Sequence, residues 1–559
     1  MATYHVENFG CRATQADGAA LDRQFQQRGL DRAPSADADL VILNTCTVTA
    51  AADQDARAAI RRTRRQNPNA KIVVTGCYAQ RAPQELAALP GVSAVIGNSH
   101  KHQLADIALQ NALIPEGRQQ GREGEDFSRA TDVFMRPASA DGVDAQESGQ
   151  TFVPLSALIQ NSGSPEPKSG SRLFVSDIFA HTELLGAPVF EGITAGFHAD
   201  QRTRPNLKVQ DGCDNRCSFC VIPYVRGQSR SLPLREVLRE VNALVTAGYR
   251  ELVISGINLG RWGRDLDLGP QTSDHGKSGF RLPASGVRWP SDDDMNKRLS
   301  PSSFDLPKVR GPRSDVAFRQ PGAGSRQPTF ENLIRAILAN TSLEKLRISS
   351  VEPMDWSDEL IRLVAASPRI AKHAHVPLQS GSDAVLRRMH RKYRPWHYRE
   401  RIEKIRAAMP TAAIGADVMV GFPGESATEF EATRQFIEDL PFTYLHVFTY
   451  SARPGTPAAD LPNQVPVHIA RERNRILRTL GEEKKERFMR SFIGQTVDAI
   501  TLGSSERFGA GVAVREGDGT EALTDNYLKL HLKGHHESNL WIKAEVKAVE
   551  ASTLIAEPR

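Results

Sequence analysis

The 559-residue chain lacks the features that would place it in a membrane or outside the cell. No segment approaches the roughly 20 apolar residues of a membrane-spanning helix. The first ten residues, MATYHVENFG, have neither the basic start nor the apolar run of a signal peptide. The net charge is only +5, so a nucleic-acid partner is permitted but not required. These absences predict a cytoplasmic protein with no membrane partner.

Cysteine is scarce as well, and no fourth cysteine lies near either group of three. In a long intracellular chain, a few cysteines more often bind metal or serve catalysis than form disulfides. The six cysteines divide into an N-terminal set and a central set: Cys11, Cys46 and Cys77, then Cys213, Cys217 and Cys220.

Each cysteine of the N-terminal set closes a stretch that reads as a strand, and a helical segment follows each one. The stretches are ATYHVENFGC, ADLVILNTC and AKIVVTGC. Strands alternating with helices predict a parallel sheet with helices on its faces, here in a domain of residues 1–115. Because parallel strands end at the same sheet edge, we expect the three thiols to converge there. Buried structural thiols are the alternative, but the shared position favours an iron–sulfur site.

The central set lies in one short stretch, GCDNRCSFCVIP (212–223). A structural zinc site is the alternative, but such sites are tetrahedral and no second pair of ligands is nearby. A ferredoxin-like electron carrier would need a fourth cysteine within reach. The spacing lets one loop hold three corners of an iron–sulfur cubane. The fourth iron would then be open to a substrate or cofactor.

A series of strands and helices predicts a closed or partly closed (βα) barrel over residues 198–440. In its first helix, Ser231 suits the N-cap and Gly248 the end. Residues 441–490 are interpreted as the end of this core and a charged connecting helix, and short alternating strands over 491–559 predict a small β-barrel. The fold class is therefore α/β, with an N-terminal parallel sheet domain, a partial (βα) barrel core and a C-terminal all-β barrel.

Two regions lack the periodicity of helices and strands. Residues 116–197 are rich in Gly, Ser, Pro and Gln and are predicted to be a largely disordered linker. A short element is allowed within it, in the stretch LFVSDIFAHTELLG. Residues 267–326 have the same character and are predicted to be a disordered insertion in the core.

Residues 386–406 are strongly basic, with nine Lys or Arg against two acidic residues. Aromatic residues lie among them, including Tyr393, Trp396 and Tyr398. Cations attract phosphates and rings stack on unpaired bases, so this stretch is a candidate RNA contact. An exposed, charged helix face is the alternative, and composition alone favours it.

These features together resemble the radical S-adenosylmethionine methylthiotransferases. The resemblance extends over nearly all of the chain outside the two aperiodic regions. The motifs that carry it are GCRATQAD, LNTCTVT, GCYAQR, DGCDNRCSFCVIPYVRGQSRS, ISGINLGRWG, VPLQSGSDAVLRRMHRKY, VMVGFPGES and YSARPGTPAA.

The resemblance implies two [4Fe–4S] clusters and S-adenosyl-L-methionine as cofactors. The N-terminal set would hold an auxiliary cluster that serves sulfur insertion. The central set would hold the radical cluster, whose free iron binds the amino and carboxylate groups of S-adenosylmethionine, while the protein orients the cofactor and excludes water. Gly256, Asn258 and Ser350 are weaker candidates for contacts to S-adenosylmethionine. No catalytic side chain is indicated.

The family has three branches, which modify isopentenyladenosine in tRNA, threonylcarbamoyladenosine in tRNA, or an aspartate of a ribosomal protein. RISSVEP and DGCDNRCSFCVIPYVRG are most similar to the threonylcarbamoyladenosine branch, whereas GCRATQAD departs from the Lys-Val-Asn that more often follows Gly-Cys there. The resemblance thus implies a methylthiotransferase acting on N6-threonylcarbamoyladenosine at position 37 in the tRNA anticodon loop.

The resemblance implies further partners and leaves alternatives open. An electron donor such as flavodoxin or ferredoxin and a source of sulfur would be needed, and the C-terminal barrel resembles the RNA-binding TRAM domain. The alternatives within the family are the other two branches. The alternative outside the enzymes is an iron–sulfur RNA-binding protein.

Overall fold

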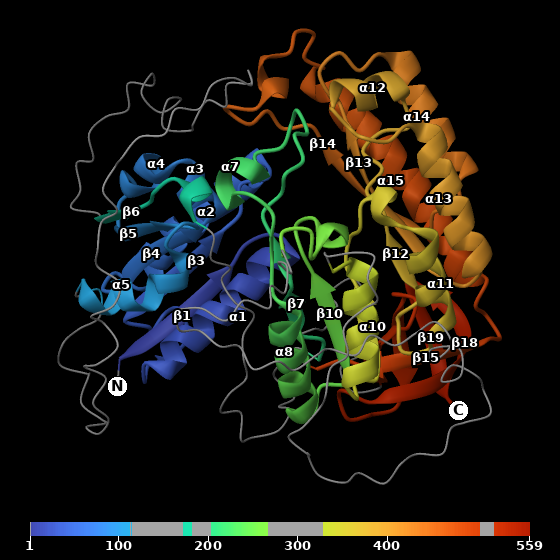
Figure 1. The fold of residues 1–559 in the computed structure, drawn as a ribbon, viewed down its shortest axis with the longest axis horizontal. Coiled ribbons are helices and arrows are strands. Elements are labelled where there is room, and N and C mark those ends of the chain that lie inside the picture. Colours follow the sequence, from blue (N-terminus) through green and yellow to red (C-terminus); the bar gives the residue numbers. More distant parts are fainter. Residues whose placement is uncertain (1, 112, 114–171, 182–202, 267–327, 504–518) are drawn as a thin grey trace, which may run out of the picture.

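The computed structural model describes residues 2–111, 113, 172–181, 203–266, 328–503 and 519–559 (Figure 1). The disorder predicted within 116–171, 182–197 and 267–326 lies outside the described residues. The described part forms a parallel sheet domain, an α/β core and a β-barrel, in that order along the chain.

The N-terminal domain is a six-stranded sheet in which every strand pair is parallel. The strand order is β2-β1-β3-β4-β5-β6. The strands are β1 (Thr3–Asn8), β2 (Asp31–Arg32), β3 (Leu40–Thr45), β4 (Lys71–Gly76), β5 (Val92–Gly97) and β6 (Arg172–Phe174). The helices are α1 (Arg12–Gln27), α2 (Ala50–Gln66), α3 (Cys77–Arg81), α4 (Pro83–Ala87), η1 (Lys101–Gln103) and α5 (Leu104–Gln110).

The central strand β3 shows why this sheet forms. It reads LVILNT, and all six residues are buried. Leu40 and Ile42 pack with α1 and α5, whereas Val41 and Leu43 pack with α2 and α4. A parallel sheet covered on both faces requires such an unbroken apolar strand, because both sets of alternating side chains are buried.

Residues 172–181 depart from the linker predicted for 116–197. β6 pairs with β5, and the 3-10 helix η3 (Ile178–Ala180) follows it. Ser176 anchors the segment: its carbonyl accepts from Gln80 Nε2 at 2.9 Å, and its amide donates to Ser99 Oγ at 3.1 Å. The short element allowed in LFVSDIFAHTELLG is therefore confirmed, because the free edge of β5 supplies main-chain partners to a stretch with little apolar periodicity.

The core consists of two three-stranded parallel sheets, β11-β10-β7 and β12-β13-β14. Parallel bridges from Leu346 to Ile370 and from Ser350 to His375 join them, so the six strands form a partial barrel. The strands are β7 (Asn206–Lys208), β10 (Glu251–Ser255), β11 (Lys345–Ile348), β12 (His373–His375), β13 (Ala413–Val420) and β14 (Tyr444–Thr449). A small pair, β8 (Gln210–Asp211) and β9 (Arg230–Ser231), flanks the helix α7 (Ile222–Arg226).

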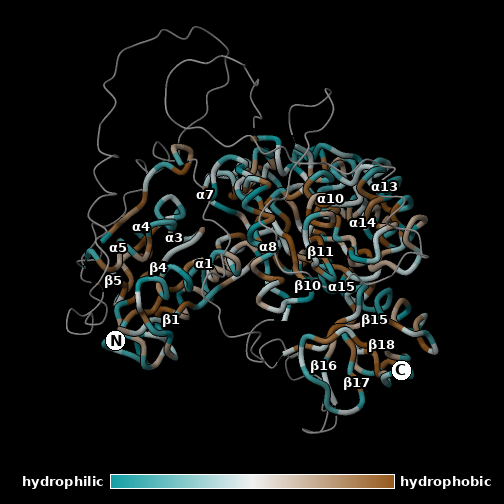
Figure 2. The backbone as a smooth tube through the Cα atoms, turned by 60° about the horizontal axis from the view of Figure 1, so that its bottom comes forward, coloured by the Kyte–Doolittle hydropathy of each residue, from teal (hydrophilic) through white to brown (hydrophobic). Residues whose placement is uncertain are grey.

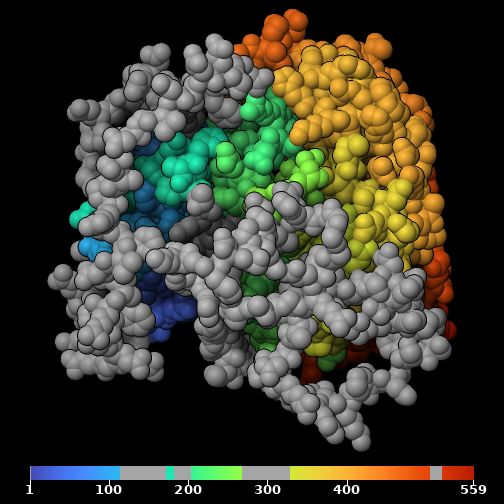
Figure 3. All heavy atoms as spheres, viewed as in Figure 1, coloured from blue at the N-terminus to red at the C-terminus, as the bar shows by residue number. Residues whose placement is uncertain are grey.

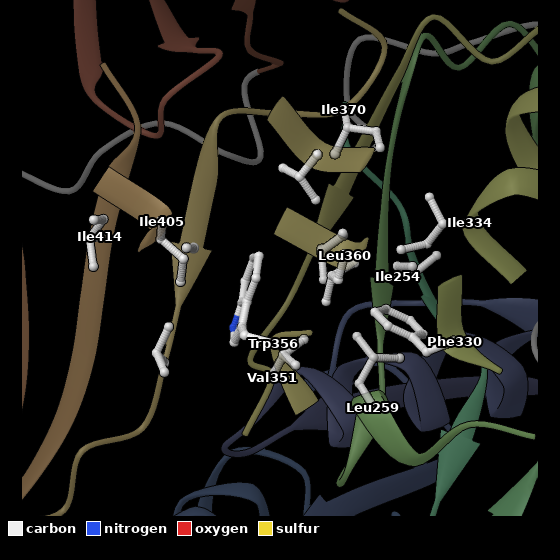
Figure 4. Packing of buried hydrophobic residues seen from close by; sticks show 14 of the residues in the cluster. Ile254, Leu259, Phe330, Ile334, Val351, Trp356, Leu360, Ile370, Ile405 and Ile414 are labelled. Atoms are coloured by element: carbon white, nitrogen blue, oxygen red, sulfur yellow. The ribbon is translucent and has the colours of Figure 1, made fainter. Parts of the chain in front are cut away.

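Helices cover the outer face of this partial barrel. Figure 4 shows Ile254 of β10, Ile334 and Leu360 packed together in the apolar cluster between strands and helices. The elements are α8 (Leu234–Thr246), η4 (Leu259–Arg261), α10 (Phe330–Asn340), η5 (Pro353–Asp355), α11 (Asp358–Ala366), α12 (Asp383–Arg388), α13 (Pro395–Ala408), α14 (Ala427–Asp439) and η6 (Pro457–Asp460).

The first helix of the core begins later than its sequence predicts. α8 starts at Leu234 with Pro233 as its N-cap, and Ser231 is not the cap. Ser231 lies in β9, and its amide donates to Asp265 Oδ2 at 2.7 Å. The local N-cap preference is overridden because β9 pairs with β8. Gly248, with φ of 94°, follows the end of the helix as predicted.

Alternation along the core strands separates an apolar outer face from a polar inner face. Ala374 of β12 and Ala416 of β13 belong to the helix-covered cluster. Their neighbours His375 and Asp417 must therefore point to the opposite, inner side. Tyr444 lies on that inner side too, because a Cβ built on Gly415 would lie 1.9 Å from the tyrosine Cζ. The inside of the partial barrel is thus lined by polar and aromatic groups.

The helix α15 (Val467–Arg490) leads to a closed five-stranded barrel of order β15-β16-β17-β19-β18. Its strands are β15 (Thr496–Thr501), β16 (Gly519–Thr524), β17 (Lys529–Lys533), β18 (Trp541–Glu550) and β19 (Thr553–Pro558). Figure 2 shows this barrel beneath the core and apart from the N-terminal strands. Arg347 donates to the carbonyls of Thr524 and Asp525, which ties the barrel to the core. The predicted small β-barrel is confirmed, and its likeness to TRAM stays a prediction.

Candidate metal centres

The N-terminal cysteines meet at one sheet edge. Cys11 is the N-cap of α1, Cys46 follows β3 directly, and Cys77 begins α3 directly after β4. A Cβ built on Gly10 would lie 2.5 Å from the Cβ of Cys46, so the turn before Cys11 touches Cys46. Burial and the neighbouring thiols of Cys77 and Cys11 raise the pKa of Cys46 to about 12. The structure thus brings together the three residues that the sequence predicted to converge.

The central cysteines lie on the loop between β8 and α7. The amide of Cys213 donates to Gly227 O at 3.0 Å, and the amide of Cys220 donates to Cys217 O at 3.1 Å, so the loop is folded on itself. Burial raises the pKa of Cys213 to about 11, and burial together with Cys217 raises that of Cys220 to about 12. Thiols this hard to ionise become thiolate ligands only when a metal replaces the proton.

Nitrogen donors from distant parts of the core point at the central sulfurs. Arg391 Nη1 lies 3.3 Å from Cys217 Sγ, and Asn258 Nδ2 lies 3.8 Å from Cys213 Sγ. The amide of Asn215 donates to Cys213 Sγ at 3.4 Å. Hydrogen bonds to thiolate sulfur stabilise its negative charge and tune an iron–sulfur cluster. These donors therefore fit a bound cluster better than they fit three neutral thiols.

Among the described residues, no group of three or more His, Cys, Asp or Glu side chains is placed to hold a metal ion. A cubane does not need three ligands on one metal, because each thiolate binds a different iron. The donor set in each set of cysteines, three sulfurs without a carboxylate or imidazole, matches iron–sulfur chemistry. The assignment of the six cysteines as ligands stays a prediction.

Two of the three candidate contacts for S-adenosylmethionine adjoin the central loop. A Cβ built on Gly256 would lie 2.9 Å from Gln210 Oε1, and the amide of Asn258 donates to that oxygen at 2.7 Å. Asn258 Oδ1 is buried and has no hydrogen-bond partner among the described residues. An unpaired buried acceptor beside Cys213 fits a site that a ligand completes. Ser350 is exposed just after β11 and forms a parallel bridge with His375 of β12.

A buried charge cluster lies where the N-terminal domain meets the core. Its members come from α1, η1, β7, β8 and α7: Asp17, Lys101, Lys208, Asp211 and Arg226. Burial alone would raise the pKa of Asp17, but the three cations outweigh it and lower that pKa. Local sequence patterns do not predict this cluster, although Asp17, Asp211 and Arg226 lie within the motifs GCRATQAD and DGCDNRCSFCVIPYVRG.

A second ion-pair contact joins the domains beside Cys46. Arg453 Nη1 lies 2.7 Å from Asp53 Oδ2 and 3.3 Å from the carbonyl of Thr47. Arg81 also pairs with Asp53, at 2.9 Å. Arg453 belongs to the motif YSARPGTPAA, in which it is the only charged residue, and that was the signal available. Its contacts to Asp53 and Thr47 hold the edge of the N-terminal sheet against the core.

In the basic stretch 386–406, several of the cations and rings that could contact RNA are paired or buried. Tyr393 and Tyr398 are buried and donate to main-chain carbonyls, so the prediction that they stack on bases is wrong. Arg401 and Lys404 pair with Asp358. The apolar side of α13 draws Tyr398 into the core, whereas Trp396, 57% exposed, and the exposed His397 stay available for stacking.

The inner face of the core holds a linked group of rings and carboxylates. The hydroxyl of Tyr444 lies 2.7 Å from His373 Nε2 and 3.0 Å from His375 Nδ1, and His375 Nε2 lies 3.1 Å from Asp417 Oδ1. Burial and the nearby Arg347 lower the pKa of His373 well below its ordinary value. The lining therefore combines hydrogen-bonding rings with one carboxylate, Asp417, a mixture that suits a planar ligand with donors at its edge.

Comparisons with known proteins agree with this architecture. A family model described as "Uncharacterized protein family UPF0004" matches residues 3–97, and the "Radical SAM superfamily" model matches residues 322–437. The chain is similar to "Threonylcarbamoyladenosine tRNA methylthiotransferase MtaB" of Bacillus subtilis (strain 168), with 30% identity over 96% of this chain and 91% of that protein.

Two further proteins show the range of the similarity. "tRNA-2-methylthio-N(6)-dimethylallyladenosine synthase" of Syntrophotalea carbinolica is 29% identical over 91% of this chain and 90% of its own length. The solved structure of the radical S-adenosylmethionine methyltransferase TsrM from Kitasatospora setae, with cobalamin and a [4Fe-4S] cluster bound, covers 82% of this chain and 74% of its own at 15% identity and a TM-score of 0.45. No helix within the described ranges has the length and apolarity to cross a membrane.

Proposed function

This chain belongs to the radical S-adenosylmethionine tRNA methylthiotransferase family, and from that premise we propose that it converts N6-threonylcarbamoyladenosine at tRNA position 37 to its 2-methylthio derivative. The observation that carries the choice of nucleoside is the activity for which the relatives are named. Three of them, including the proteins of Bacillus subtilis and Aquifex aeolicus, are named threonylcarbamoyladenosine tRNA methylthiotransferases and match at 29 to 30% identity over 95 to 98% of this chain.

Dimethylallyladenosine is the second candidate nucleoside. The synthase of Syntrophotalea carbinolica, which is named for it, shares 29% identity with this chain. That identity is so close to the value for the first group that sequence similarity alone does not separate the two substrates. The test below therefore measures both nucleosides.

Enzymes of this family use two [4Fe–4S] clusters and S-adenosyl-L-methionine. The N-terminal and central cysteine sets are proposed to hold the auxiliary and radical clusters respectively. When bound, the radical cluster supplies one electron to S-adenosylmethionine, and the auxiliary cluster serves sulfur insertion. Asn258 would orient the amino-acid part of S-adenosylmethionine, because its Oδ1 is buried without a partner in the described residues and its Nδ2 faces Cys213.

The inner face of the partial barrel is the proposed site of the adenine base. Tyr444, His446 and Phe448 alternate along β14 and share that face, and Phe448 is 46% exposed. Rings placed in a row offer stacking surfaces to a planar base. His375 and Asp417 would supply hydrogen bonds at the edge of the base, close to the strand ends where the central loop lies.

The nucleosides of total tRNA test this proposal. We expect a strain that lacks this protein to lose 2-methylthio-threonylcarbamoyladenosine in mass spectrometry and to accumulate the unmodified precursor. Wild-type protein should restore the product, whereas protein with the central cysteines changed to alanine should not. Loss of the methylthio-dimethylallyl nucleoside instead would establish the second candidate. No change in either nucleoside, in a strain without a paralogue, would contradict both.

The remaining partners follow from the chemistry. Single-electron delivery requires a low-potential donor, for which a flavodoxin or a ferredoxin is proposed, and sulfur insertion requires a renewable sulfur source. Both operate in the cytoplasm, where tRNA is modified, and this location is part of the proposal.

A further inference from the structure

One side chain of the N-terminal domain contacts both a cysteine of the N-terminal set and the helix α7, which follows the central set. Asn98 follows β5 at the same sheet edge as the N-terminal cysteines. Its Nδ2 donates to the carbonyl of Val225 at 2.7 Å and lies 3.6 Å from Cys77 Sγ. Val225 is in α7, which begins two residues after Cys220. A single amide group therefore connects the end of α7 with a ligand candidate of the other set.

The next residue of α7 is held by both domains. Arg226 is 2% exposed. Its Nη2 lies 3.0 Å from Asp17 Oδ2 of α1, and its Nη1 lies 2.9 Å from Asp211 Oδ1, two residues before Cys213. Asp17 is on the helix that Cys11 caps. The guanidinium is planar and forked, so it fixes the direction as well as the separation of the two carboxylates.

Apolar packing completes this contact of α7 with Asn98, Asp17 and Cys77 of the N-terminal domain, which we call the joint. Cys77 forms a buried cluster with Val221 and Val225, against which the partly buried Ile222 packs; these three residues lie within five positions of Cys220. In Figure 3 the green part of the core, the colour range that contains α7, lies between the blue and teal N-terminal domain and the orange part of the core. Because interiors are close-packed, a shift of α7 moves both cysteine sites together.

The charge at this joint is positive. The buried cluster of the domain interface contains three cations and two carboxylates, which leaves one positive charge in excess. A buried uncompensated cation is costly unless a negative group faces it. Arg226 is paired with both carboxylates of this cluster, so the loss of either contact would leave a buried charge without its partner.

We propose that Asn98 and Arg226 are positioning residues that fix the auxiliary cysteine site relative to the radical site through the short helix α7. The inference rests on the proposed assignment of the two cysteine sets. Its consequence is coupling: when the joint is intact, each cleavage of S-adenosylmethionine is followed by delivery of sulfur to the same substrate. When the joint is loosened, cleavage continues but the activated substrate and the sulfur are misaligned, because small displacements of reacting groups are enough to slow a reaction strongly.

The test compares Asn98→Ala and Arg226→Gln with a matched control, Asn67→Ala. Asn67 also donates its side-chain amide to two carbonyls, those of Ser35 and Ala38, but at the turn after α2, away from the cysteines. Full-length protein is reconstituted anaerobically, and iron content is measured first. The ratio of 5′-deoxyadenosine to methylthiolated nucleoside is then determined on substrate tRNA. The magnetic interaction between the two reduced clusters is recorded by electron paramagnetic resonance.

We expect wild-type iron content in all variants, a ratio raised several-fold in Asn98→Ala and Arg226→Gln, and an altered cluster–cluster interaction in these two alone. Arg226→Lys, which keeps the charge but not the fork, should give an intermediate ratio. If Asn98→Ala loses iron, Asp17→Asn, which leaves the contact to Cys77 intact, should still raise the ratio. An unchanged ratio and an unchanged spectrum in Arg226→Gln and Asp17→Asn would overturn the proposal.

The same experiment separates this inference from the proposed function. Wild-type protein with only one cluster, or wild-type protein that makes no methylthiolated nucleoside, would refute the proposed function. Suppose that wild-type protein holds two clusters and makes normal product, and that the variants have the same ratio of 5′-deoxyadenosine to methylthiolated nucleoside as wild type. That result would refute the positioning role alone.

Discussion

At the scale of single residues, the two cysteine sets differ in how their thiols are held. The central thiols receive hydrogen bonds from Arg391, Asn258 and a main-chain amide. In the N-terminal set, Cys77 accepts from Asn98 instead, and Cys46 is buried. Because the two sets have different donors, we expect that each set can be removed separately, with separate effects.

Removal of the central set should abolish the first chemical step. With Cys213, Cys217 and Cys220 changed to Ala, we expect iron in reconstituted protein to fall from about eight to about four per chain. Cleavage of S-adenosylmethionine should cease, because no cluster remains to donate the electron. Iron analysis and chromatography of 5′-deoxyadenosine measure the two effects. Cleavage at the wild-type rate would exclude the central set as the radical site.

Removal of the N-terminal set should spare that step. With Cys11, Cys46 and Cys77 changed to Ala, we expect 5′-deoxyadenosine still to form and the methylthiolated nucleoside to disappear, because no site remains to deliver sulfur. Metal binding and folding are coupled, so a circular dichroism spectrum close to that of wild type is the required control. A folded variant that makes product normally would show that these residues are buried thiols without a ligand role.

At the scale of elements, the cysteine sites depend on sharp turns from strand to helix. Gly76 stands between β4 and α3 with φ of 100°, and a Cβ there would lie 2.3 Å from the carbonyl oxygen of Thr45. Gly29 follows α1 with φ of 76° and has no atom within 4 Å of such a Cβ. The two glycines share a left-handed backbone but differ in the space around them.

We expect Gly29→Ala to cost about 1 kcal/mol of unfolding free energy from backbone strain alone. Gly76→Ala should cost more, because the main chain of β3 must also move, and it should lower the iron bound at the N-terminal set by displacing Cys77. Urea unfolding and iron content check both effects. Equal costs and equal iron content in the two variants would contradict the role given to the turn.

At the scale of the whole molecule, the interface between the N-terminal domain and the core should depend on pH. Burial would raise the pKa of Asp17 and of Asp211, but the cations of the cluster lower both in the folded protein. A carboxylate with a lowered pKa contributes stability that is fully present above its unfolded pKa of about 3.9. That stability is lost as the pH falls below this value toward the folded pKa.

Between pH 5 and about pH 2.5, we therefore expect the stability of wild type to fall more steeply than that of Asp17→Asn, which cannot titrate. Urea midpoints across this range measure the slopes. The comparison isolates one carboxylate, because all other titrating groups are shared. Parallel slopes would show that Asp17 does not hold the domains together through its charge.

The sequence by itself determined the elements and the cysteine edge. Two local patterns were enough: unbroken apolar strands such as β3, and a cysteine at the end of each strand. Because parallel strands end at the same edge of a sheet, these cysteines must lie at that edge. The closed C-terminal barrel followed from short alternating strands in the same way. Ser231 was misjudged because a local N-cap preference is weak compared with the pairing of β9 with β8.

Only the tertiary structure decided which charged and polar side chains meet. Asp17, Lys208 and Arg226 are far apart in the chain, and nothing in their local sequence marks them as partners. The same is true of Asn98 and Val225, and of the burial of Tyr393 in a basic stretch that was a candidate RNA contact. Local patterns specify periodicity and turns. Contacts between distant segments exist only after the domains have packed. Packing removes water from these polar groups, and a buried group without a partner then costs free energy.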